Sequence, residues 1–217
     1  MNFTNYDVRR YARERLNGNW LKGALITIIV AVIGGVLAGI NFIWRDLIIL
    51  GAALNVVIAI VLIPLQIGIM FVYLRFSRGD TLEYSGLTYG YKNGMFLKSI
   101  GLTIMTGIFT FLWTLLFIIP GIIKAISYSL ASYVLIDNPN LGWRECLNES
   151  KKLTNGCKGQ IFLLGLSFIG WMILGALTAG ILYLFIVPYM QTSFANFYDR
   201  RRIDIYGLPQ EAEPVQA

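Results

Sequence analysis

The chain has 217 residues, of which 56% are hydrophobic and 14% charged, and its formal net charge is +6. A soluble globular domain of this length does not show that balance, which is typical of an integral membrane protein. Because the sequence contains no histidine, His-based metal sites, Ser-His hydrolysis and histidine proton relays are excluded. The two cysteines, Cys146 and Cys157, are expected to be reduced and unpaired, since both fall in a connection predicted to be cytoplasmic.

The first 22 residues predict an amphipathic helix that lies on the membrane surface. Basic side chains from Arg9 to Lys22 alternate with apolar ones at helical spacing, which favours contact with anionic headgroups. The apolar run that follows is long enough to fill a bilayer, and no cleavage site followed by a soluble domain is present. We therefore interpret this run as a retained first span.

Four uncharged runs occupy residues 23–44, 47–74, 99–123 and 159–198. A bilayer core of about 30 Å needs roughly 20 apolar residues per helix. The last run would form a helix of about 60 Å, so it is predicted to fold back near residues 177–180, and a short apolar segment at 121–136 is predicted to return after the third run. The expected fold is all-α, a polytopic membrane helix bundle of six transmembrane helices. These form three hairpins, which are joined by interfacial amphipathic helices.

Each predicted hairpin has one proline in, or at the start of, its second helix. Pro64, Pro120 with Gly121, and Pro188 are predicted helix breaks, because proline removes a backbone hydrogen bond. Broken helices at membrane depth often line cavities.

The basic residues predict the orientation of the chain. With six spans, the N-terminal segment, both long connections and the C-terminal segment lie on one side of the membrane, and they hold all the Lys and Arg residues except Arg45 and Lys124. Both termini should therefore be cytoplasmic. We expect a single transmembrane domain over residues 1–203 and a disordered cytoplasmic tail over residues 204–217.

An Asn-Gly pair precedes each predicted hairpin, at 17–18, 93–94 and 155–156. This pattern suggests a threefold internal repeat over residues 5–75, 80–137 and 140–200, each copy having an interfacial segment and a hairpin. The alternative is that Asn-Gly is a common helix stop that each connection needs independently.

Lys124 is the one basic residue predicted to lie within the bilayer, where a charge is costly. Lys124, Tyr128 and Ser132 share one face of a helix, and Asp46 is the only acid predicted on the same side of the membrane. We treat these four residues as a candidate ligand-binding site for an anionic group. The alternatives are that Lys124 extends its chain to the interface and that the hydroxyls only join helices.

The C-terminal half contains the segments IIPGIIKAISYSLASYVLID, ESKKLTNG, LSFIGW and PYMQTSFANFY in this order. Their order and spacing resemble the bacterial integral membrane family labelled domain of unknown function 975. The resemblance implies a multi-span fold in a bacterial cell membrane and no particular mechanism.

Two functions remain open. The first is a non-enzymatic protein that binds, or helps to move, an anionic lipid or amphipathic peptide. The second is a non-catalytic accessory or scaffold subunit whose amphipathic helices contact a protein partner. An enzyme is not expected, since the spans lack paired acids and metal-ligand spacing. No metal, cofactor or nucleic acid is expected, and the basic residues lie where the topology requires them.

Overall fold

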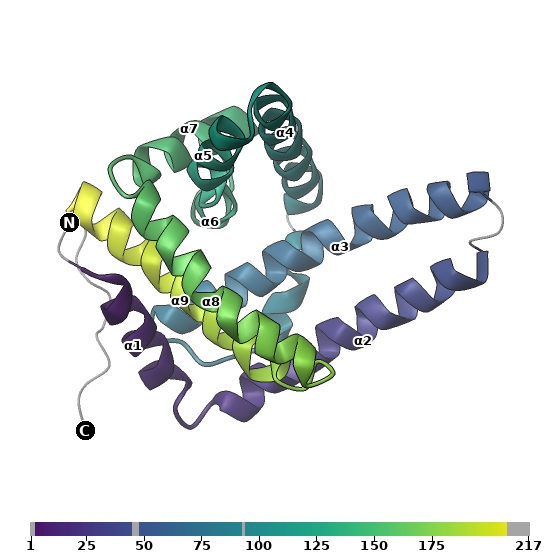
Figure 1. The fold of residues 1–217 in the computed structure, drawn as a ribbon, viewed down its shortest axis with the longest axis horizontal. Coiled ribbons are helices and arrows are strands. Elements are labelled where there is room, and N and C mark those ends of the chain that lie inside the picture. The colour runs from purple at the N-terminus through teal and green to yellow at the C-terminus, as the bar shows by residue number, and fades with distance from the viewer. Residues whose placement is uncertain (1–2, 45–47, 93, 208–217) are drawn as a thin grey trace.

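The computed structural model describes residues 3–44, 48–92 and 94–207. Within these ranges every regular element is a helix, so the all-α prediction is confirmed. In chain order the elements are α1 (Asn5–Leu16), α2 (Trp20–Trp44), α3 (Ile48–Ser77), the 3-10 helix η1 (Tyr84–Tyr91), α4 (Met95–Leu116), α5 (Ile118–Tyr128), α6 (Ala131–Asp137), α7 (Trp143–Thr154), α8 (Lys158–Leu177) and α9 (Tyr183–Tyr206) (Figure 1).

Five segments of the described chain are long and apolar enough to cross a membrane. They are Trp20–Ile40, Gly51–Ser77, Met95–Leu116, Ile118–Asp137 and Lys158–Leu177. These match five of the six predicted spans. The sixth falls in α9, which is less apolar because it carries polar residues such as Thr192, Ser193 and Asn196. The six-span, three-hairpin arrangement stays a prediction.

Helix α9 contacts α1, α2, α3, α7 and α8 (Figure 1). Its polar side chains Thr192, Ser193 and Asn196 are buried between these neighbours. A Cβ atom on Gly23 would lie 2.9 Å from Cβ of Pro188, so the glycine permits the close approach of α2 and α9. Burial by protein explains why this helix can be more polar than the others.

Helices α1 and α7 are the two amphipathic helices, as predicted. Helix α1 is capped at Thr4, whose backbone N–H donates to the Asp7 carboxylate at 2.8 Å. In α7, the Gly142 N–H donates to Glu145 at 2.7 Å in the same way. Each helix buries one face against the bundle, and its exposed face carries basic residues: Arg10 and Arg13 in α1, and Arg144, Lys151 and Lys152 in α7.

Two details differ from the sequence predictions. The fourth predicted span is divided between α5 and α6 at residues 129–130, where the Ser129 N–H bonds to the Ile126 carbonyl in a tighter turn. The predicted tail is helical up to Tyr206, and an ion pair of 2.7 Å from Arg201 to Asp204 supports this last turn. Residues 208–217 lie outside the described residues.

Helices α3 and α9 continue through Pro64 and Pro188, so neither proline ends its helix. The kinks expected at these two prolines stay a prediction. Tyr91 is the last residue of η1, and its hydroxyl donates to the Val61 carbonyl in the turn before Pro64, so η1 holds this turn from outside. The chain does break before Pro120, but at Phe117, which is extended. Gly121 has another role: a Cβ atom there would lie 2.3 Å from Oγ1 of Thr114, so α4 and α5 can pack closely.

Candidate functional site

Three helix ends that are far apart in the sequence meet in a buried network of charges. Arg78 follows α3 directly, Asp137 ends α6, and Asp199 lies in the last third of α9. The Arg78 guanidinium donates two hydrogen bonds to Asp137, at 2.7 and 2.8 Å, and two to Asp199, at 2.7 and 2.9 Å. Arg202 adds a second cation to Asp137.

Further hydrogen bonds complete this network. The Tyr198 hydroxyl donates to Asp137 at 2.8 Å, and the Ser77 hydroxyl donates to Asp199 at 3.0 Å. Burial opposes the charge on Arg78, but hydrogen bonds and negative charge from Asp137 and Asp199 outweigh it and raise the pKa of Arg78 above its ordinary value. Two cations and two carboxylates neutralise one another here and hold three helices together, while the buried Nε of Arg202 has no hydrogen-bond partner within the described residues.

A different arrangement lies between α4, α5 and α7, where a cavity of about 320 Å³ is lined by aromatic and basic side chains. Arg144, Asn148 and Lys151 occupy one exposed face of α7, at helical spacing. The Arg144 guanidinium lies 5.0 Å from the centre of the Trp143 ring, and the Lys151 ammonium lies 5.6 Å from the centre of the Tyr128 ring. We call this cavity the α7 site.

The two cations of the α7 site have no carboxylate partner in the described part of the chain. The closest polar contact of Lys151 is its hydrogen bond of 3.2 Å to the Asn148 side chain. The neighbouring Lys152, by contrast, pairs with Glu149 at 3.1 Å on another face of α7. The α7 site therefore presents uncompensated positive charge against aromatic walls, which suits an anion with an apolar portion.

The candidate site of four residues around Lys124 stays a prediction. The Lys124 ammonium lies 4.6 Å from the centre of the Trp113 ring, a cation–π contact between α5 and α4. Tyr128 lines the α7 site, whereas Ser132 is in α6, beyond the division of the predicted span. Asp46 lies outside the described residues.

The cysteines offer no reactive site. Cys146 and Cys157 are free and buried, as expected. Burial raises the pKa of the Cys146 thiol to about 11, and it also raises the pKa of Cys157. Within the described residues, no three Asp, Glu or Cys side chains are grouped so that they could hold a metal ion.

Sequence reasoning missed both the charge network and the α7 site. Arg78 and Asp137 are 59 residues apart, and Arg78 and Asp199 are 121 apart. The sequence did carry one signal for the charge network. An apolar helical segment that returns to the same predicted side precedes each of its residues Arg78, Asp137 and Asp199. For the α7 site, the signal was the spacing of Arg144, Asn148 and Lys151 beside Trp143.

An all-α chain with five segments long and apolar enough to cross a bilayer defines an integral membrane protein. The chain belongs to the family described as protein of unknown function (DUF975), whose model matches residues 1–130 and 115–203. No curated protein and no solved structure matches the chain.

Proposed function

We propose that this chain is a non-catalytic membrane protein that binds an anionic lipid, with the lipid phosphate held by Arg144 and Lys151 in the α7 site. The observation that carries the proposal is the pair of unpaired cations over Trp143 and Tyr128, at the mouth of a cavity of about 320 Å³. A phosphate needs such donors, and the aromatic rings suit the glycerol and first methylenes of a lipid.

The surroundings of the α7 site support a lipid more than a soluble anion. Helices α4 and α5 expose large apolar side chains beside the site, among them Phe111, Leu112, Leu115 and Ile122. Acyl chains pack on such surfaces without any enclosed pocket. An amphipathic peptide with an acidic end has related chemistry, and we treat it as an outcome of the test.

The proposal includes the bacterial plasma membrane with both termini cytoplasmic. The clustering of basic residues in the segments that hold α1, η1 and α7 supports this orientation. It would place the α7 site at the cytoplasmic leaflet, whose anionic lipids attract Lys and Arg.

The test compares lipid retention by the wild type and by the Arg144→Gln/Lys151→Gln double variant. Both would be reconstituted in nanodiscs of phosphatidylcholine with 10% phosphatidylglycerol, and bound lipid would be counted by native mass spectrometry. We expect about thirtyfold weaker phosphatidylglycerol retention in the variant, from about 1 kcal/mol for each of the two cations. Lys152→Gln is the control for removing one positive charge from the same helix outside the site, so it should leave lipid retention unchanged.

Lys124→Ala tests the other candidate cation in the same assay. If only Lys124→Ala releases the lipid, the phosphate is bound at Lys124 and the α7 site is the wrong site. If no variant changes lipid retention but the double variant loses a copurifying protein, the accessory or scaffold function replaces the lipid proposal. A copurifying peptide lost from the double variant would identify a peptide as the ligand.

A further inference from the structure

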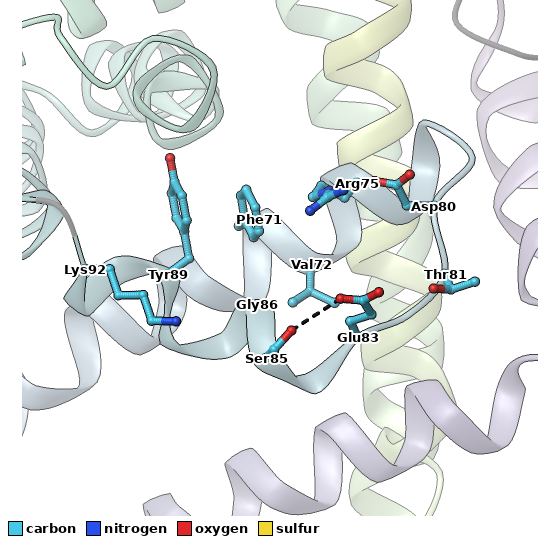
Figure 2. A pocket seen from close by; sticks show the side chains of 10 residues that line it. All are labelled: Phe71, Val72, Arg75, Asp80, Thr81, Glu83, Ser85, Gly86, Tyr89 and Lys92. Carbon is cyan, nitrogen blue, oxygen red and sulfur yellow. Dashed lines mark hydrogen bonds and ion pairs between the residues drawn. The ribbon is translucent and has the colours of Figure 1, made fainter.

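A second hollow, of about 230 Å³, lies between the last turns of α3 and the segment that contains η1 (Figure 2). Its aromatic wall is formed by Phe71 and Tyr89, whose rings stack at 4.0 Å between centres and 4° between planes. Charged residues surround the opening: Arg75, Asp80, Glu83 and Lys92. We call this hollow the η1 site.

The walls of the η1 site are held in place by very close backbone packing. A Cβ atom on Gly90 would lie 2.0 Å from the Pro64 carbonyl oxygen, and one on Gly68 would lie 2.0 Å from the Leu87 carbonyl oxygen. A Cβ atom on Gly86, in the site itself, would lie 2.6 Å from the Val72 side chain. The η1 site is therefore preformed, which lowers the entropic cost of binding a ligand.

The charges around the η1 site fall into two groups. Arg75 and Asp80 neutralise each other through a contact of 2.6 Å. Lys92 and Glu83 form no ion pair in the described part of the chain, and the Glu83 carboxylate accepts only the Ser85 hydroxyl, at 3.3 Å. Figure 2 shows the Lys92 ammonium and the Glu83 carboxylate on opposite sides of Ser85, facing the same hollow. The site thus offers one free cation and one free anion to a ligand.

We propose that the η1 site binds a small zwitterion that carries a phosphate and an amine, with the phosphate at Lys92 and the amine at Glu83. A ligand with both charges satisfies both side chains, whereas a simple anion or cation leaves one of them unpaired. The hollow is smaller than the roughly 300–1,000 Å³ of drug-sized pockets. It therefore accommodates a headgroup and not a whole lipid.

The position of the η1 site favours a phosphate-bearing ligand over other zwitterions. The site lies at the end of the apolar segment Gly51–Ser77, and Tyr84 and Tyr91 of η1 are exposed beside it. Tyrosines at the end of a span mark the level of phospholipid headgroups. The ligand's source is either the headgroup of an aminophospholipid or a soluble amine-bearing phosphodiester. The inference does not depend on the α7 site, with which the η1 site shares no lining residue.

The first experiment uses three soluble probes on the full-length protein in detergent: glycerophosphoethanolamine, glycerol 3-phosphate and ethanolamine. Isothermal titration calorimetry should show that the zwitterion binds at least about tenfold more tightly than either singly charged probe, the effect of one additional charge-assisted contact. Glu83→Gln should remove the preference over glycerol 3-phosphate, and Lys92→Gln the preference over ethanolamine.

Glu14→Gln and Lys22→Gln are the matched controls, because they remove the same charges from exposed positions outside the η1 site. Equal affinity for the zwitterion and for glycerol 3-phosphate in the wild type would overturn the proposal. So would an unchanged preference in both site variants.

A second arm distinguishes the two sources, using nanodiscs with and without phosphatidylethanolamine. If the soluble zwitterion gives no heat, retention of phosphatidylethanolamine that falls about tenfold in Glu83→Gln and Lys92→Gln identifies the lipid headgroup as the ligand. Binding of the soluble probe alone identifies a soluble ligand. Binding of neither overturns the proposal and leaves the test of the α7 site unaffected.

Discussion

At the scale of single residues, the most consequential side chain is the Asp137 carboxylate, which is 6% exposed and contacts both Arg78 and Arg202. It also accepts the Tyr198 hydroxyl. Asn has the same shape but no charge. Asp137→Asn therefore leaves Arg78 paired with Asp199 alone and removes the ion pair of Arg202. Removing one partner of a buried pair usually costs about 3–5 kcal/mol.

We therefore expect Asp137→Asn to lower the free energy of unfolding by about 3 kcal/mol or more. The measurement is reversible unfolding in mixed micelles with increasing SDS. Asp80→Asn is the control, because the Arg75–Asp80 pair is about half exposed and such a pair contributes roughly 0–1 kcal/mol. Equal losses in the two variants would show that the network is not a structural centre.

Cys146 provides a pH-dependent test of the packing of α7. Only the thiolate reacts with maleimide, and burial raises the pKa of this thiol to about 11. In a Cys157→Ala background, the native protein should therefore label slowly at pH 7.5, with a rate that rises about tenfold per pH unit up to pH 10. SDS-unfolded protein should label rapidly at pH 7.5. Rapid labelling of the native protein would mean that α7 detaches from the bundle.

At the scale of elements, the contact between α3 and η1 depends on glycine. Gly90→Ala would bring a methyl group to within 2.0 Å of the Pro64 carbonyl oxygen, so η1 would have to move away from α3. We expect a loss of about 1–3 kcal/mol in stability, as for other overpacked sites, and weaker binding of the zwitterion at the η1 site. Thermal unfolding and the calorimetric titration measure the two effects.

Gly107→Ala is the control for this prediction, because a Cβ atom there meets nothing within 4 Å. Alanine is also the better helix former, so the control should be neutral or slightly more stable. A Gly90→Ala variant as stable as Gly107→Ala would mean that the packing of η1 on α3 does not need glycine.

Elements were more predictable than sites, for a physical reason. The spans and the amphipathic helices follow from local hydrophobicity, and they were predicted from the sequence. The fold-back near residues 177–180 was predicted as well, because one apolar run is too long for a single span. The division between α5 and α6 carries no proline or glycine signal at Ser129 and Leu130. The predicted Lys124–Ser132 stripe assumed one straight helix, whereas this segment is divided between α5 and α6.

At the scale of the whole molecule, the contacts between elements follow a cyclic order. Each interfacial segment packs on the returning helix of the preceding predicted unit: η1 on α3, α7 on α5, and α1 on α9. The first helix of each predicted hairpin also packs on the returning helix of the preceding unit: α4 on α3, α8 on α5, and α2 on α9. The charge network joins residues at or near the ends of the three returning helices.

This order is what a threefold repeat would produce, although the repeat itself stays a prediction. Helices α7 and α8 begin 138 residues after α1 and α2, at 143 and 158 against 5 and 20. Gly18, Gly94 and Gly156 have φ angles of 78°, 73° and 77°, so all three Asn-Gly pairs use the left-handed backbone that glycine favours. Independent helix stops would explain the glycines but not the cyclic contacts.

The same contacts argue for six crossings, although α9 is the least apolar of the predicted spans. Helix α8 begins near α1, since the Gln160 side chain donates to the Phe3 carbonyl at 3.1 Å. The last third of α9 reaches the charge network through Asp199, which contacts Arg78, and α3 and α6 end at the same network. If α8 crosses the membrane, α9 must therefore cross back. A five-span chain would separate Asp199 from Arg78 by the thickness of the bilayer.

We predict that cysteines at exposed positions will report this topology in whole cells. Phe117 and Ile181 lie in the turns after α4 and α8, and Tyr6 and Tyr84 lie in α1 and η1. In a background without Cys146 and Cys157, Phe117→Cys and Ile181→Cys should react with a membrane-impermeant maleimide in intact cells. Tyr6→Cys, Tyr84→Cys and Tyr206→Cys should react only after permeabilisation. Tyr206→Cys labelled in intact cells, with Tyr6→Cys protected, would mean that α9 does not cross, and the cyclic bundle would then be wrong as a membrane arrangement.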